Sequence, residues 1–128
     1  MKATLFFATL VVSAASMAVS VSAAAADAPA RFASGALVAS NGMTIYSFDN
    51  DKADSGESVC NGPCAALWPP MLAVAGDQPV SPYSAVSRDD GSRQLAYKGK
   101  PLYFYKVDQK AGDRLGDNFK DVWHVIKE

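Results

Sequence analysis

The stretch VASNGMTIYSFDND, residues 38–51, returns in altered form as LAYKGKPLYFYKVD at residues 95–108. The two segments align at a constant offset of 57 residues. A tryptophan follows each segment at a similar distance, because Trp68 and Trp123 come 22 and 20 residues after the aligned tyrosines. Self-similarity at a fixed spacing is typical of a duplicated structural unit. The identical pairs are Ala39/Ala96, Gly42/Gly99, Tyr46/Tyr103 and Asp51/Asp108.

Each segment is predicted to form a β-hairpin. Asn41-Gly42 is a strong two-residue hairpin signal, because both turn positions must tolerate a positive φ. Lys98-Gly99 is a weaker version of the same signal. The residues after each turn are β-branched or aromatic, which favours a pleated and half-buried strand.

Side chains alternate between the two faces of a strand, so each unit should place its motif aromatics on one face. This alternation puts Tyr46 and Phe48 together, opposite Ile45 and Ser47. The second unit repeats the arrangement with Tyr103 and Tyr105 opposite Leu102 and Phe104. Such aromatics usually pack in a core, although a stacking surface for a sugar, haem or peptide is the alternative.

The rest of the chain adds few regular elements. Asp90-Gly91 indicates a further turn, and residues 121–127 (DVWHVIK) favour a closing strand over a short helix. One short helix is expected at residues 64–68, ending before Pro69. The predicted fold is a small, mostly β single domain at residues 27–128, with related hairpin units at about 36–70 and 93–126.

The N-terminus has the features of a secretory signal peptide. A single positive charge at Lys2 precedes an uncharged apolar run that reaches Ala23. This pattern predicts a signal peptide at residues 1–23, cleaved after Ala23 or Ala26, with an N-terminal membrane anchor as the alternative. We therefore expect a periplasmic or secreted protein.

Composition excludes several function classes. Without Lys2 the chain carries 11 basic and 13 acidic residues, a formal charge of −2, and it contains no basic patch of the kind that nucleic-acid binding requires. No second apolar run is long enough to span a membrane after signal cleavage. The oligomeric state is not predicted by the sequence.

The motif residues also carry a family resemblance. Tyr46, Phe48 and Asp51 fit the pattern tyrosine-x-aromatic-x-x-aspartate, and Tyr103, Tyr105 and Asp108 fit it again. Together with CNGPCAALWPP at residues 60–70, this chain resembles the family of secreted bacterial proteins, many of them lipoproteins, that is defined by the repeated motif. The resemblance covers nearly all of the chain after residue 27 and implies no catalytic residues. The chain lacks the lipidation cysteine of the lipoprotein members, so the resemblance does not extend to membrane anchoring.

Cys60 and Cys64 are the only cysteines. In an exported chain they are predicted to form a disulfide that stabilises a small core. A thiol-redox role is one alternative, although the spacing is C-x3-C and not the C-x-x-C of thioredoxin-like motifs. A copper site is the other alternative, with both thiolates and either His124, the only histidine, or a methionine such as Met43 or Met71 as ligands.

The acids are assigned local roles. Asp51 and Asp108 occupy equivalent positions in the repeat and should accept hydrogen bonds from backbone amides after each strand. The acidic stretch at residues 49–57 fails the EF-hand template, because its fifth and sixth positions are Ala53 and Asp54. A solvated turn is expected there, with a looser calcium loop as the alternative.

No catalytic constellation is visible in the sequence. Neither Ser58 nor Ser87 lies in a nucleophile-elbow pattern, and no resident cofactor or metal is expected. The predicted function is a non-enzymatic domain that binds an envelope ligand or protein not identified by the sequence. A periplasmic copper-handling or thiol-redox protein is the alternative.

Overall fold

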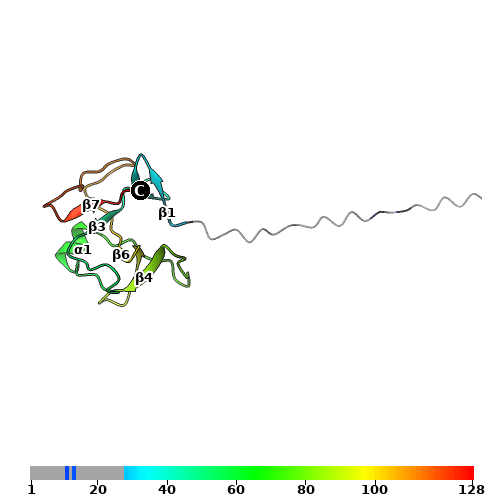
Figure 1. Cartoon of the computed structure of the whole chain (residues 1–128), viewed down its shortest axis with the longest axis horizontal. Coiled ribbons are helices and arrows are strands. Elements are labelled where there is room, and N and C mark those ends of the chain that lie inside the picture. Colours follow the sequence, from blue (N-terminus) through cyan, green and yellow to red (C-terminus); the bar gives the residue numbers. More distant parts are fainter. Residues whose placement is uncertain (1–10, 12, 14–27) are drawn as a thin grey trace, which may run out of the picture.

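The computed structural model describes Val11, Ser13 and residues 28–128, so the predicted signal peptide and both cleavage sites lie outside the described residues. The described domain is mostly β with one short helix (Figure 1). The elements are β1 (Ala30–Ala33), β2 (Ala36–Ala39), β3 (Tyr46–Phe48), α1 (Pro63–Leu67), β4 (Tyr83–Ser87), β5 (Arg93–Tyr97), β6 (Lys100–Pro101) and β7 (Trp123–Val125).

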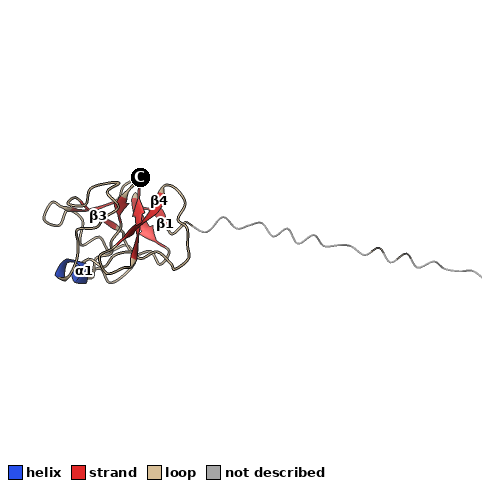
Figure 2. Cartoon of the chain, turned by 90° about the horizontal axis from the view of Figure 1, so that it is seen from below, coloured by secondary structure: helices blue, strands red, loops and turns tan. Residues whose placement is uncertain are grey.

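These strands form three small antiparallel sheets, ordered β1-β2, β3-β7 and β4-β5-β6. The β1–β2 hairpin, which the sequence did not indicate, turns at Ser34 and Gly35, both with positive φ. The closing strand and the short helix lie close to their predicted positions. Figure 2 shows the strands at the centre of the domain, loops around them and α1 at one edge.

The two predicted hairpins differ from each other. Lys98 and Gly99 form a two-residue turn with φ of 48° and 81° between β5 and β6. At the other turn only Gly42 has a positive φ, and the side-chain oxygen of Asn41 accepts a hydrogen bond from the Met43 amide at 3.0 Å. The prediction of a two-residue Asn41-Gly42 turn is therefore wrong, because the asparagine side chain instead stabilises a longer turn.

The longer first turn shifts the alignment of the two units by one residue. The Ile45 amide donates to the Leu37 carbonyl at 3.1 Å, and the Leu102 amide donates to the Leu95 carbonyl at 2.9 Å. Leu37, and not Val38, is therefore the structural counterpart of Leu95. The offset of 57 holds from the turn glycines to the motif aspartates and fails before the glycines.

The two motif strands meet at the centre of the molecule. Tyr46 and Tyr103 exchange backbone hydrogen bonds of 2.8 and 3.0 Å in an antiparallel bridge. Each motif strand also pairs with the segment that contains the other unit's tryptophan: β3 pairs with β7, and the Phe104 amide donates to the Pro69 carbonyl at 2.7 Å. The units are thus interlocked around an approximate two-fold axis.

Side chains of the motif strands alternate between two faces as predicted, and each face packs into a different apolar cluster. The first contains the motif aromatics and both tryptophans, while the second contains Ile45, Leu102 and residues of β1, β2 and β5. Both clusters are buried, so neither face of a motif strand is open to solvent at these positions. The C-terminus lies beside β1 and β2, where Ala36 bridges Lys127 (Figure 1).

Candidate functional site

The tyrosines and aspartates of the repeated motif are paired between the units and not within them. The Tyr46 hydroxyl donates to Asp108 Oδ2 at 2.6 Å, and the Tyr103 hydroxyl donates to Asp51 Oδ2 at 2.5 Å. Both carboxylates are almost fully buried, with Asp51 1% and Asp108 7% exposed. We call these two contacts the crossed Tyr–Asp pairs.

The second oxygen of each carboxylate is also occupied. Asp51 Oδ1 accepts a hydrogen bond from the Val59 amide at 2.8 Å, and Asp108 Oδ1 accepts one from the Leu115 amide at 3.0 Å. The structure thus contains the backbone donors expected from the sequence, seven or eight residues further along the chain. The tyrosine donors were not predicted, because nothing in the motif indicates that its partners belong to the other copy.

The crossed pairs keep both phenols neutral. Burial is the largest cause that raises the pKa of Tyr46 and Tyr103 above the ordinary value of 10.0, and the hydrogen bond to a carboxylate raises it further. Neither group is therefore suited to act as a base at neutral pH. Their role in the described structure is to satisfy two buried carboxylates.

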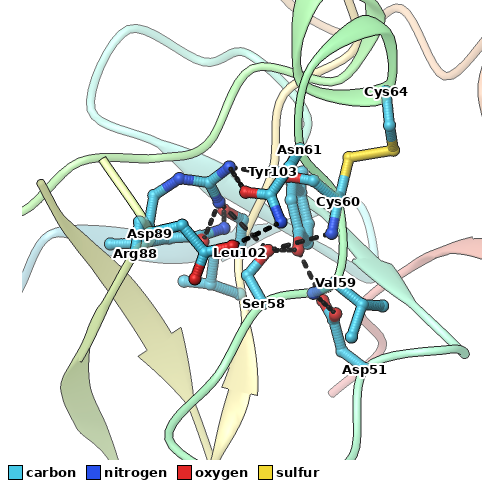
Figure 3. The surroundings of a disulfide bond; sticks show 11 residues. Asp51, Ser58, Val59, Cys60, Asn61, Cys64, Arg88, Asp89, Leu102 and Tyr103 are labelled. Atoms are coloured by element: carbon cyan, nitrogen blue, oxygen red, sulfur yellow. Dashed lines mark hydrogen bonds between the residues drawn. A yellow bond between two sulfur atoms is a disulfide. The ribbon is translucent and has the colours of Figure 1, made fainter. Parts of the chain in front are cut away.

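A buried guanidinium completes the polar network on the Asp51 side. Arg88 is 8% exposed, and its Nη1 donates to Ser58 Oγ at 3.0 Å and to Gln94 Oε1 at 2.7 Å. Ser58 Oγ, which accepts from Arg88, contacts the Tyr103 hydroxyl at 2.5 Å, and that hydroxyl donates to Asp51. A hydrogen-bond chain thus runs from the cation to the carboxylate and balances two buried charges (Figure 3).

The two cysteines form the predicted disulfide. Cys60 is fully buried, and its carbonyl accepts a hydrogen bond of 2.6 Å from Arg88 Nη2. The disulfide closes the loop from Cys60 to Cys64, which contains two acceptors for the guanidinium, the Cys60 carbonyl and Asn61 Oδ1 (Figure 3). A copper site would need both sulfurs as free thiolates, and the structure holds them in the disulfide.

Four aromatic rings stack through the middle of the first cluster. The Trp68 and Trp123 rings lie 3.9 Å apart and 2° from parallel. Phe48 stacks on the outer side of Trp123 at 4.2 Å, and Tyr105 stacks on Trp68 at 4.0 Å. All four side chains are buried, so the motif aromatics form core and not an exposed stacking surface.

His124 faces away from Trp123 and Val125, as expected for a strand. Its Nε2 lies 2.8 Å from Asp49 Oδ2, and its Nδ1 lies 3.0 Å from Asn118 Oδ1. The residues described in the structure contain no group of three His, Cys, Asp or Glu side chains suited to a metal ion. His124 and the two cysteines are therefore not brought together as ligands.

An apolar groove of about 290 Å³ lies on the surface beside β4, and we call it the linker groove. Most of its wall comes from residues 72–83, the segment between the two units, and the rest comes from Ala28, Pro29 and Leu95. The linker residues in the wall are Val74, Asp77, Gln78, Pro79, Val80, Ser81, Pro82 and Tyr83. Sequence reasoning missed this groove, because its walls come from three separate segments.

The architecture defines a class of proteins built from two interlocked copies of one small β unit. The family model described as a secreted repeat of unknown function matches the chain twice, at residues 33–71 and 84–127, and the chain belongs to this family. The protein is therefore periplasmic or secreted. No curated protein and no solved structure matched the chain.

The two matches agree with the predicted units, except that the second begins earlier than expected because β4 pairs with β5. They leave residues 72–83 outside both repeats. Among the described residues, no helix is long and apolar enough to cross a bilayer.

Proposed function

We propose that this chain is a non-enzymatic binding domain of the cell envelope, in which the two repeats provide a rigid frame and the linker groove holds the ligand. The observation that carries this proposal is the origin of the groove. Eight of its eleven lining residues belong to residues 72–83, the segment that lies outside both family matches. Val80 and Val74 are 72% and 69% exposed beside it, and exposed apolar patches of this kind are typical of binding surfaces.

The hydrogen bonds that already occupy the reactive side chains support a non-enzymatic role. Both oxygens of Asp51 and of Asp108 accept hydrogen bonds in the folded domain, and the two terminal nitrogens of Arg88 donate four hydrogen bonds there. Both ring nitrogens of His124 have polar partners. These groups act in the fold, and a catalytic group must be free to contact a substrate.

The ligand that suits the groove is an extended polypeptide. β4 is an edge strand of its sheet and pairs with β5. The Lys98 amide donates to the Pro82 carbonyl and the Arg88 amide donates to the Ser92 carbonyl, so the backbone groups of every second residue of β4 face β5. The amides of Ala85 and Ser87 therefore point away from the sheet, where an added strand can accept their hydrogen bonds. Apolar side chains of that strand would enter the groove, and a basic one would complement Asp77, the single charged residue in its wall.

Selection of binders from a phage library of random octapeptides, with the exported chain as bait, tests the proposal. We expect peptides with alternating apolar residues, and we expect Val80→Asn to weaken them about 10-fold, the equivalent of losing one buried valine contact. Ser87→Pro should also weaken them, because it removes an outward amide without removing a bond to β5. Val107→Asn, at another exposed valine, is the control.

Two results would overturn the proposal. One is a set of peptides that binds the Val80 and Ser87 variants as tightly as the unmodified chain. The other is substrate turnover by the purified protein that disappears when one named residue is replaced.

A further inference from the structure

A second groove, of about 240 Å³, lies away from the linker and carries positive charge. Its wall is formed by Ser47, Tyr97, Lys98, Lys100, Ile126 and Lys127. We call it the lysine groove. None of its six lining residues is acidic, although the chain without Lys2 has a formal charge of −2.

The three lysines come from different parts of the fold. Lys98 occupies the β5–β6 turn, Lys100 lies in β6, and Lys127 follows β7 near the C-terminus. The pairing of β3 with β7 brings the last of these toward Ser47 on β3. The groove therefore exists only when the two units are assembled.

Lys100 is held in place by the fold. Its ammonium donates to the Asp51 carbonyl at 2.9 Å and to the Phe48 carbonyl at 3.2 Å. An ammonium has three N–H donors, so one remains for a ligand. The exposed ammonium of Lys98 lies 5.4 Å from the centre of the Tyr97 ring, which places it beside the wall of the same groove.

We propose that the lysine groove binds the phosphate group of a phosphate ester. Three ammonium groups act as point charges and suit a tetrahedral anion with several oxygens, whereas planar carboxylates favour the fork of an arginine, which this groove lacks. The Tyr97 ring and Ile126 offer apolar contact to the organic part of the ester. The nearby acids, Asp54 against the turn and Glu128 at the C-terminus, do not line the groove.

This site is independent of the linker groove. The ester has two possible sources in the envelope: the headgroup of an anionic phospholipid and a soluble phosphate monoester. Both present the same chemistry to the lysines, and one experiment separates them.

Binding of the exported chain is measured at low and physiological salt to vesicles of phosphatidylglycerol and phosphatidylcholine, to vesicles of phosphatidylcholine alone, and to glycerol 3-phosphate by calorimetry. Binding only to the phosphatidylglycerol vesicles identifies the headgroup as the source. Binding to glycerol 3-phosphate identifies a soluble ester. Binding to neither probe overturns the proposal.

The variant Lys98→Asn/Lys127→Gln tests the location of the site, and both lysines are exposed, so the fold should not change. Each lysine near an anionic surface contributes about 5-fold in affinity, so the pair should lose roughly 25-fold. The control variant Lys106→Gln/Lys110→Gln removes the same charge outside the groove and should lower the affinity by less than about 2-fold. Equal losses in the two double variants would show that the attraction is general and would overturn the proposal.

Discussion

The hydroxyl groups of Tyr46 and Tyr103 connect the two copies of the motif at the level of single atoms. Each hydroxyl donates to a buried carboxylate of the other unit. A buried carboxylate that loses a donor retains its full desolvation cost, so the loss of either contact should lower the free energy of unfolding by more than the net value of one hydrogen bond. The sequence identifies all six motif residues but not their partners, because the contacts join residues 62 and 52 positions apart.

A double-mutant cycle should detect the crossing. We expect Tyr46→Phe and Asp108→Asn each to lower the free energy of unfolding by about 1–3 kcal/mol. Their coupling energy should reach about 1 kcal/mol, because the two side chains share one hydrogen bond. Tyr46→Phe with Asp51→Asn, taken from the same unit, is the control and should be additive within about 0.5 kcal/mol. Urea denaturation measures all of these values, and stronger coupling within a unit than across units would contradict the crossed arrangement.

Stability at high pH should depend on the same two hydroxyls. The pKa of Tyr46 and of Tyr103 is raised in the folded chain, mainly by burial, so only the unfolded chain ionises readily above pH 10. Their contribution is therefore fully present below pH 10 and is lost above it, at about 1.4 kcal/mol per pH unit for each tyrosine. Urea denaturation between pH 8 and 11.5 measures this slope. The variant Tyr46→Phe/Tyr103→Phe should have a shallower slope, and identical slopes would exclude the two phenols as the cause.

At the scale of elements, the turn signals and the strand alternation in the sequence predicted most of what forms. The hairpin at Lys98-Gly99, the turn near Gly91, the closing strand and the short helix all follow from local residue preferences. β1 was missed, because its alanines have low strand propensity and its pairing with β2 depends on burial in the second cluster. The turn at Asn41 and Gly42 is longer than predicted, because the asparagine side chain accepts a hydrogen bond that a tight backbone turn would otherwise make.

The turn at Gly99 should tolerate substitution poorly. An added Cβ would lie 2.8 Å from the Asp54 amide nitrogen and even closer to the Asp54 carboxylate, and the φ of 81° already disfavours alanine. Gly91 has a similar φ of 86° but open space around it, so Gly91→Ala isolates the backbone cost. We expect about 1 kcal/mol for Gly91→Ala and at least roughly 2–3 kcal/mol for Gly99→Ala. Thermal and urea denaturation test this, and equal losses would mean that Asp54 moves aside freely.

At the scale of the whole molecule, the two units exchange their strands and aromatic rings and do not stack as independent repeats. In solenoid proteins each repeat contacts only its neighbours, and folding can begin at any repeat and spread along the stack. Here the first cluster takes residues from both units, including the stacked Trp68 and Trp123. The sequence predicted two related units in one domain, but it could not show that each unit completes the other. Arg88 and the linker groove were missed for the same reason, because Arg88 meets Ser58 and Cys60 across 30 and 28 positions.

The interlocked core predicts a single cooperative unfolding transition. Tryptophan fluorescence, which reports the shared cluster, and far-ultraviolet circular dichroism should give the same urea midpoint. A variant confined to one unit, such as Tyr46→Phe, should move both curves together. Two separate transitions, or a variant that shifts only one probe, would mean that one unit persists without the other.

The crossed Tyr–Asp pairs also constrain how such a duplicated gene can diverge. After most duplications one copy can accumulate changes while the other preserves the original role. Here a substitution at Tyr46 leaves the carboxylate of Asp108 without its donor, so the damage appears in the opposite copy. Selection therefore acts on the two copies as one unit.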